Sequence, residues 1–208
     1  MKHKNLYTMV YAAFLGLVCA LIPTAVGTYT KPLREANAKV DEIKNTLRVL
    51  GIPFDANAPS KDLVAFFQDK VIREAQGNQA LYYAKPAAGA VPDPVALPFE
   101  GRGVWGPIKG YLALASDMRT IKAITFYFHE ETPGLGGEIS TPGFTGRFPG
   151  KKIVGADGAP AFHIRRMSAS GQNEIDGISG ATLTGGKVES IMNNLAERIV
   201  KEKIHAGQ

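Results

Sequence analysis

The most prominent feature of the hydrophobic pattern is a long apolar segment near the N-terminus. No Asp, Glu, Lys or Arg occurs between Lys4 and Lys31, and residues 6–26 read LYTMVYAAFLGLVCALIPTAV. At 1.5 Å per residue, a helix of this length spans roughly 30 Å, which matches the hydrocarbon core of a bilayer. The pattern therefore predicts a single transmembrane helix within residues 1–30.

Two other interpretations of this segment are a cleaved signal peptide, with MKHK as its charged region, and a lipoprotein anchor through Cys19. The apolar stretch is long and no small-x-small cleavage site follows it cleanly, which argues against cleavage. Val18 precedes Cys19, where a lipoprotein would carry a small residue. A retained span is therefore favoured, whereas the similar positive charge on its two flanks leaves the orientation open.

The next stretch repeats apolar residues with helical spacing. Its apolar positions are Ala36, Val40, Ile43, Leu47 and Leu50. Gly51 and Pro53 follow where such a helix should end. A second short helix is predicted in PSKDLVAFFQDKVI, with Ser60 as its N-cap. Residues 31–76 are thus expected to form a juxtamembrane helical segment that packs one face on the following domain.

Residues 77–208 are expected to form an extracytoplasmic domain that begins with strands. Residues 77–98 are predicted to be mostly loop, with a short strand around ALYYA. Residues 108–115 and 121–129 are apolar runs joined by SDMRT, which predicts a hairpin. KKIVGADG and AFHIRRM are predicted to form another pair, joined by the turn residues Asp157-Gly158.

The C-terminal region is predicted to be an amphipathic helix that starts at Thr184. One stripe of this helix carries Val188, Ile191, Leu195 and Ile199. Together the elements indicate an α+β fold, an antiparallel sheet with packed helices, anchored by the N-terminal transmembrane helix.

Composition limits the chemistry that the domain can perform. The net charge is +5, but the basic residues are scattered without a Lys/Arg run, which argues against nucleic-acid binding. Four histidines and one cysteine argue against a Cys/His metal site and against an internal disulfide. Redox chemistry would therefore require a bound organic cofactor or another chain.

Residues 176–186, DGISGATLTGG, place several hydroxyls among glycines directly before the C-terminal helix. The residues alone allow two interpretations. Thr184 can cap the helix as part of an ordinary helix start. Alternatively, the free N–H groups and the helix dipole form an anion site, where Gly185 and Gly186 allow close approach and Lys187 adds charge. The segment is not a P-loop, so a nucleoside triphosphate has no support.

This segment resembles the S-G-A-T flavinylation motif of covalent FMN-binding domains. In that family a flavin transferase attaches FMN to a threonine through a phosphoester, and the matching residue here is Thr182. Residues 131–139, ETPGLGGEI, resemble the E-T-P-G-L-G segment that lies beside the flavin ring in the same family. Residues 101–114, GRGVWGPIKGYLAL, and the N-terminal span also resemble, in order and spacing, the C subunit of the sodium-translocating NADH:quinone oxidoreductases.

A close relative of that family is the G subunit of the Rnf-type ferredoxin:NAD oxidoreductases. The stretches GVWGPI and TPGFTGRFPGKK favour the first complex over the second. One departure is length, because this chain is shorter than expected for the C subunit.

The resemblance implies roles for individual residues. Thr182 carries FMN, and Gly180 and Ala181 keep the chain narrow beside the phosphate. Leu135 packs on the isoalloxazine, and Thr132 hydrogen-bonds the edge of the ring. The remaining expected cofactor contacts are Ser179, Leu183, Thr184, Gly134, Gly136 and Trp105.

Several neighbouring residues are given plainer roles. Trp105 either shields the flavin or belongs to the core. Glu130 and Glu131 are expected to be solvated loop charges, because an electron carrier needs no general base, so no catalytic residue is assigned. Asp176 is a turn-former or part of the signal that the transferase reads.

The resemblance implies an electron relay in a membrane complex that couples NADH oxidation and quinone reduction to Na+ export. The implied partners are other membrane subunits, the flavin transferase and the lipid bilayer, with the soluble domain on the periplasmic side of a bacterial inner membrane. No G-x-G-x-x-G follows a strand, so no NADH site is expected on this chain. A non-redox scaffold domain and a free-standing flavin reductase are the alternatives.

Overall fold

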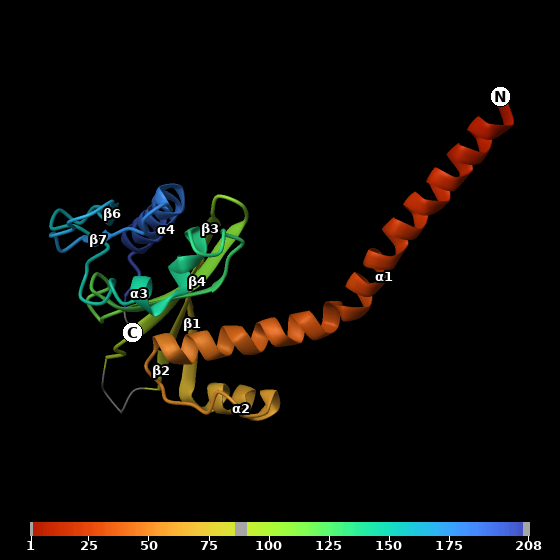
Figure 1. The fold of residues 1–208 in the computed structure, drawn as a ribbon. Helices are drawn as coiled ribbons and strands as arrows, with labels where there is room; N and C mark the ends of the chain where they lie inside the picture. Colours follow the sequence, from red (N-terminus) through yellow and green to blue (C-terminus); the bar gives the residue numbers. More distant parts are fainter. Residues whose placement is uncertain (1, 86–90, 206–208) are drawn as a thin grey trace. The chain divides into compact units, whose positions relative to one another are not determined.

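The computed structural model describes residues 2–85 and 91–205, with side chains from residue 6 onward (Figure 1). The chain divides into two compact units, Met1–Val40 and Asp41–Gln208. The second unit begins well before residue 77, because the last helical turns after residue 40 and the first two strands pack with the domain.

The first unit is formed by helix α1, Lys2–Val49, whose last turns belong to the second unit. Its described part is long and apolar enough to cross a membrane, a test that a signal sequence also passes. Pro23 and Pro32 lie within the helix. The hydroxyls of Thr24 and Thr28 donate to carbonyls four residues earlier, at 2.7 and 2.8 Å, so these polar groups are satisfied within the helix.

Helix α1 ends as its sequence predicts. Leu47 and Leu50 are buried, in agreement with the predicted apolar face. Gly51 adopts a left-handed conformation with φ of 69°, and the N–H of Ile52 donates to the carbonyl of Leu47 at 3.0 Å. This is the glycine-dependent helix end that satisfies the last carbonyls.

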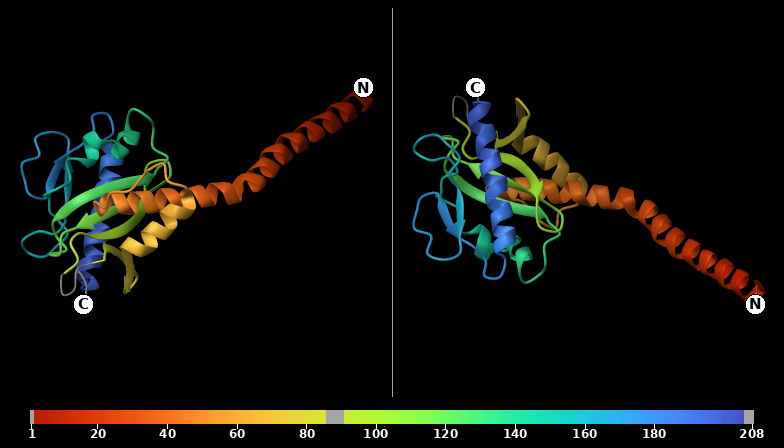
Figure 2. Two further views of the ribbon diagram at one scale, coloured as in Figure 1. Left: turned by 90° about the horizontal axis from the view of Figure 1, so that it is seen from below. Right: turned by 90° about the horizontal axis from the view of Figure 1, so that it is seen from above.

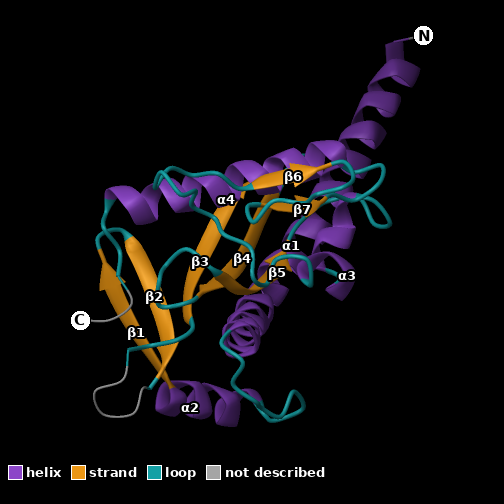
Figure 3. Cartoon of the chain, turned by 90° about the vertical axis from the view of Figure 1, so that its left-hand side faces the viewer, coloured by secondary structure: helices purple, strands orange, loops and turns teal. Residues whose placement is uncertain are grey.

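The second unit contains a five-stranded antiparallel sheet in the order β1-β2-β3-β4-β5 (Figure 3). The strands are β1 Val71–Gln76, β2 Gln79–Ala84, β3 Val95–Arg102, β4 Pro107–Leu114 and β5 Ile121–Phe128. The predicted hairpin is β4 and β5, and ALYYA lies in β2. The predictions of loop up to residue 98 and of helix up to residue 72 were too wide, because β3 and β1 begin within them.

Helix α2, Ser60–Lys70, precedes the sheet. The prediction that Ser60 caps it was wrong, since Pro59 holds the N-cap position and no side chain bonds there. The helix gives way to β1 at Val71, where a β-branched pair begins and favours the extended backbone.

Helix α4, Thr182–Lys201, covers one face of the sheet (Figure 2). The predicted stripe of α4 is buried and joins the main core. The strand residues of this core include Leu81, Val95, Leu97, Phe99, Ile108, Leu112, Ile124 and Phe126. Strand alternation explains this set, because every second side chain points to the same face.

The other face of the sheet carries aromatic hydroxyls. Tyr82, Tyr111 and Tyr127 come from β2, β4 and β5, and the ring centroids of successive pairs are 5.7 Å apart. The Tyr111 hydroxyl donates to Oε1 of Glu42 at 2.7 Å, which attaches the last turns of α1 to this face.

The predicted pairing of KKIVGADG with AFHIRRM is confirmed only next to its turn, where Val154 bridges Pro160 and the N–H of Ala161 donates to the carbonyl of Ile153 at 3.2 Å. The N–H of Ile153 also donates to the carbonyl of Arg119 at 3.0 Å, so this segment adds to the end of the β4–β5 hairpin. Strand β6, His163–Arg165, pairs in parallel with β7, Glu174–Asp176. A turn does form at Gly158, where φ is 80°. A 3-10 helix η1, Gly136–Ser140, and a short helix α3, Pro142–Thr145, complete the unit.

Candidate functional site: the start of the last helix

The attachment segment leads directly into the first turn of α4. The helix starts at Thr182 with Ala181 as its N-cap, and no side chain caps it. The prediction that Thr184 is the cap was therefore wrong. Thr184 lies inside the first turn, is buried, and donates its hydroxyl to Oε2 of Glu131 at 2.6 Å.

The hydroxyl of Thr182 has a different environment. Thr182 is exposed, as are Ser179, Gly180 and Leu183. The first helical hydrogen bond runs from the N–H of Gly185 to the carbonyl of Ala181 at 2.9 Å. The N–H groups that precede it at a helix start have no acceptor within the helix, and they carry the positive end of the dipole.

A cavity of about 450 Å³ opens beside Thr182. Residues 177–182 and Gly185 line one side of it, and residues 164–167 line the other. Its volume is within the range of small-molecule sites. The hydroxyl of Thr182 thus lies next to a space large enough for an organic cofactor.

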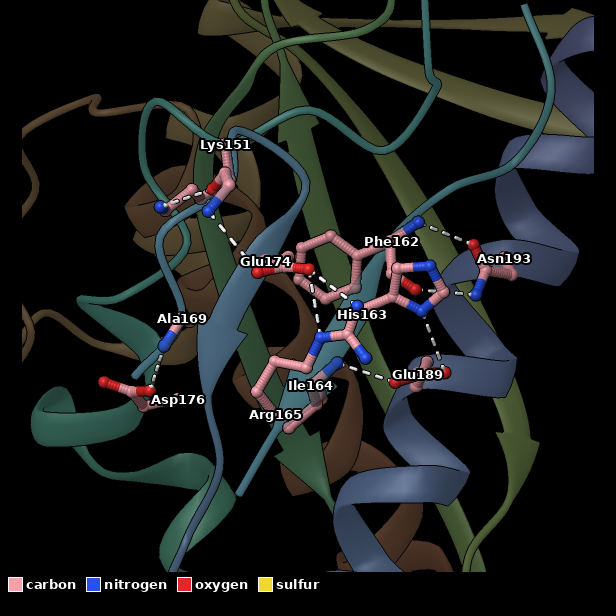
Figure 4. A network of polar contacts seen from close by, with 11 residues as sticks. Lys151, Phe162, His163, Ile164, Arg165, Ala169, Glu174, Asp176, Glu189 and Asn193 are labelled. Carbon is pink, nitrogen blue, oxygen red and sulfur yellow. Dashed lines mark hydrogen bonds and ion pairs between the residues drawn. The ribbon is translucent and has the colours of Figure 1, made fainter. Parts of the chain in front are cut away.

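The outer wall of this cavity is held to α4 by side chains of the helix (Figure 4). Asn193 accepts from the N–H of Phe162 at 3.0 Å and donates to its carbonyl at 2.9 Å. Glu189 accepts from the N–H of Ile164 at 2.6 Å. These bonds satisfy backbone N–H and C=O groups at and next to the start of β6, and they hold the strand close to the helix.

Charge on the same wall is partly compensated. Arg165 donates through two nitrogens to Oε1 of Glu174, at 3.0 and 2.7 Å, and this guanidinium lowers the pKa of the Glu174 carboxyl. His163 contacts Glu189 at 3.4 Å from the strand surface. Arg166, beside them, also lines the cavity.

The glycine-rich loop of residues 132–137 meets the attachment segment. Leu135 is 44% exposed and lies against Gly180, where a Cβ atom would come within 2.9 Å of its Cδ2. Gly180 and Gly134 both have left-handed backbones, with φ of 78° and 73°. Thr132 is exposed, and its carbonyl accepts the N–H of Gly137 at 2.9 Å.

The expectation that Glu131 is a solvated loop charge was wrong. Its side chain is only 5% exposed, whereas its neighbour Glu130 is exposed. Oε1 of Glu131 accepts from the N–H of Val104 at 2.7 Å and of Trp105 at 3.4 Å, and Oε2 accepts from Thr184. Gly136 packs against the same carboxylate and is buried.

Trp105 is 73% exposed, so it is not a core residue. Its backbone is fixed through Glu131, which places the loop at the same end of α4 as Thr184. The indole therefore lies on the surface near the site.

Arg147 is a residue of the site that the sequence did not indicate. Its Nη1 donates to the carbonyls of Asp176 and Gly177 at 2.8 and 2.7 Å, and its Nε donates to Gly143 at 2.9 Å. Arg147 thus fixes the start of the attachment segment from the α3 region. Asp176 is the last residue of β7, and its carboxylate accepts the N–H of Ala169 at 2.8 Å, which joins the two ends of residues 169–176.

Comparison with known proteins decides the family. The model of the FMN-binding domain matches residues 103–197, which include Trp105, the loop of residues 132–137 and Thr182. The C subunit of the Na+-translocating NADH-quinone reductase of Pasteurella multocida is 30% identical over 225 residues, covering 88% of this chain and 86% of that protein. The chain belongs to this family, the C subunits of the Na+-translocating NADH-quinone reductases.

Other members of this family agree with the assignment. The corresponding protein of Haemophilus ducreyi is 28% identical, covering 96% of this chain and 95% of that protein. A crystal structure of the C subunit from Parabacteroides distasonis superposes with a TM-score of 0.66 at 27% identity, covering 84% of this chain and 98% of that one. NqrC from Shewanella oneidensis, at 21% identity and a TM-score of 0.65 over 76% of this chain and 92% of that one, shares the fold.

The family and the fold class predicted from the sequence are thereby confirmed, with an antiparallel sheet, packed helices and one N-terminal apolar helix. The site residues fit an FMN group on structural grounds. The exposed Thr182, the start of α4 and the left-handed Gly180 line one cavity, and Leu135 packs against Gly180.

Proposed function

We propose that this chain is an electron-carrying flavoprotein subunit in which FMN is attached by a phosphoester to the hydroxyl oxygen of Thr182. The observation that carries the proposal is the contrast between two threonines in the first turn of α4. Thr182 is exposed beside the cavity, whereas Thr184 is buried and bonded to Glu131. The first hydroxyl is therefore open to a modifying enzyme, and the second is not.

The start of α4 is suited to the phosphate of FMN. N–H groups of the first turn and the helix dipole favour a negative group at this position. Gly186 and Lys187 are exposed one turn further on. Gly186 therefore leaves room for the phosphate, and Lys187 supplies a positive charge near it. Ala181 and Gly180 keep the approach narrow, since a side chain at Gly180 would press on Leu135.

The loop of residues 132–137 is suited to the ring system. Leu135 presents an apolar surface beside the attachment segment, and the exposed Gly134 permits close backbone approach, whereas Gly136 is buried against Glu131 and Thr184. Thr132 supplies a hydroxyl at the loop surface. We assign Ser179 and Leu183 to the walls beside the phosphate, and Trp105 to the rim of the ring site.

FMN supplies the electron chemistry when bound, and the chain supplies position, hydrogen bonds and exclusion of water. No residue of this chain is proposed to be catalytic. NADH and quinone are proposed to bind other subunits, and this domain relays electrons between redox centres of its partners. Turnover of the whole complex would export Na+.

The proposed location is a bacterial inner membrane, with α1 in the bilayer and the domain on the periplasmic side. A free flavin lost on that side would not be replaced, because no FMN pool exists there, and a covalent bond prevents the loss. A flavin transferase is proposed to form the bond during maturation.

The test is mass spectrometry of the peptide spanning residues 174–187, from the full chain co-produced with a flavin transferase. We expect an FMN phosphoester on Thr182, and yellow fluorescence that persists in a denaturing gel. A colourless band with an unmodified peptide would instead support a membrane-tethered scaffold domain, and an adduct on Ser179 or Thr184 would refute the assignment.

A further inference from the structure

Glu131 is a buried carboxylate that joins three segments of the site. It lies directly before the loop of residues 132–137 and accepts from the backbone of residues 104 and 105 and from the hydroxyl of Thr184. A buried carboxylate is stable when its oxygens accept several hydrogen bonds, and the loss of those bonds lowers the stability of the folded state. The three segments are therefore coupled through one side chain.

The surrounding backbone is shaped for this carboxylate. A Cβ atom added at Gly103 would collide with Oε1 of Glu131, and one added at Gly136 would come within 2.8 Å of its Oε2. Glycine at both positions lets two loops close directly on the side chain. The neighbouring Glu130 is exposed, so it provides a matched comparison at the adjacent position.

The bond to Thr184 fixes the rotation of the first turn of α4. The buried apolar stripe sets which side of α4 faces the sheet, but its first member, Val188, lies one turn after Thr184. Successive residues of an α-helix are about 100° apart, so Thr182 lies roughly 200° from Thr184, on nearly the opposite side. Holding Thr184 inward therefore holds Thr182 outward, toward solvent.

We propose that Glu131 is a positioning residue for the covalent attachment of FMN. It acts through Thr184 to present the hydroxyl of Thr182, and through Val104 to keep the neighbouring loop in place. This inference rests on the proposed function, in which Thr182 is the attachment residue.

The experiment measures the rate at which the full chain, purified without flavin, is labelled by a flavin transferase. We expect Glu131→Ala and Thr184→Val to slow the labelling of Thr182 roughly tenfold, because a buried hydrogen-bond partner is lost in each. Thr184→Ser keeps the hydroxyl, so its Thr182 should be labelled at the wild-type rate. Glu131→Gln keeps an acceptor for the backbone N–H groups and a polar partner for Thr184, and should label within about threefold of wild type.

Two controls separate positioning from general stability. Glu130→Gln changes the exposed neighbour and should label at the wild-type rate. Leu195→Ala weakens the core of α4 without touching the first turn, so it should lower the unfolding temperature and leave the labelling rate unchanged. The midpoint potential of labelled Glu131→Gln should rise, because a negative charge near the cofactor is removed.

The inference is overturned if Glu131→Ala labels at the wild-type rate, or if Leu195→Ala slows labelling as much as Glu131→Ala does. A wild-type chain without any adduct would mean that the proposed function fails, and the positioning role in attachment would fail with it. Hydrogen exchange at the amides of Val104 and Trp105 in unlabelled protein then still decides whether Glu131 couples the segments. Loss of their protection in Glu131→Ala, retained in Glu131→Gln, is the expected result.

Discussion

The two faces of the five-stranded sheet are built for different tasks. The face under α4 is apolar, and its core continues through Val188 to the first turn of the helix, where the candidate site lies. The opposite face carries Tyr82, Tyr111 and Tyr127 and receives the last turns of α1 through Glu42. One face therefore positions the first turn of α4 with the candidate site, and the other face contacts the last turns of α1.

The difference shows that one face of the sheet positions the candidate site, whereas the other face holds the end of α1. A close-packed apolar core fixes α4, so polar bonds at its first turn need only set rotation. On the tyrosine face, the directional hydrogen bond from Tyr111 to Glu42 joins the last turns of α1 to the sheet. Variants of the attachment segment, of the core under α4 and of the tyrosine face should therefore differ in whether they lose covalent flavin or stability.

The largest expected effect is on the α4 face. Thr182→Leu should abolish all covalent flavin in the full chain, because the attachment oxygen is removed. The free energy of unfolding should change by less than about 0.5 kcal/mol, since the residue is exposed. In-gel flavin fluorescence and chemical denaturation measure the two outcomes, and a variant that stays yellow after denaturation rules out Thr182.

The next effect concerns the core beneath the site. Leu195 is fully buried against the sheet, so Leu195→Ala should lower the free energy of unfolding by about 2–5 kcal/mol through lost burial and a cavity. Urea denaturation measures this loss. A cost below about 1 kcal/mol would contradict the view that α4 is fixed mainly by apolar packing.

A smaller effect is expected on the tyrosine face. Tyr111→Phe removes the 2.7 Å hydrogen bond to Glu42, and should lower the free energy of unfolding by about 1–2 kcal/mol. Covalent flavin content should equal that of wild type, because the site lies on the other face. Reduced flavin content in this variant would show that the two faces are coupled.

The smallest effect is a dependence on alkaline pH. Burial, with Glu42 nearby, raises the pKa of Tyr127 from its usual 10.0 to about 12, and burial also raises the pKa of Tyr111. A raised folded-state pKa means that this contribution to stability is complete below about pH 10 and is lost as the pH rises through 12. Denaturation of wild type and Tyr127→Phe between pH 8 and 12 should show a shallower decline in the variant, and parallel curves would refute the assignment.

Periodic elements with one buried side were predictable from the sequence. The stripe of α4, the β4–β5 hairpin and the apolar run of α1 each follow a local pattern of apolar residues. Strands β1 and β3 were missed, because β1 follows a helix without a break and β3 contains Pro98. The extended conformation of β1 and β3 is stabilised by pairing with the neighbouring strands, which their own residues do not reveal.

The candidate site was predictable only where it coincides with a family motif. Thr182 and the loop of residues 132–137 were identified in this way. Glu131 was misassigned because two adjacent glutamates are alike in sequence, and only one of them is buried. Arg147 was missed because its acceptors are backbone carbonyls about 30 residues away, which carry no side-chain signal.

The apolar N-terminal helix, the amphipathic last helix and the segment in which to seek a flavin attachment residue were all legible in the linear chain. The two helices depend on neighbours along the chain, so spacing and composition encode them, whereas the attachment segment was found through its resemblance to a family motif. Folding alone settles which threonine faces solvent and which carboxylate is buried. Those outcomes depend on groups brought together from distant segments, because burial and hydrogen bonding are properties of the packed chain.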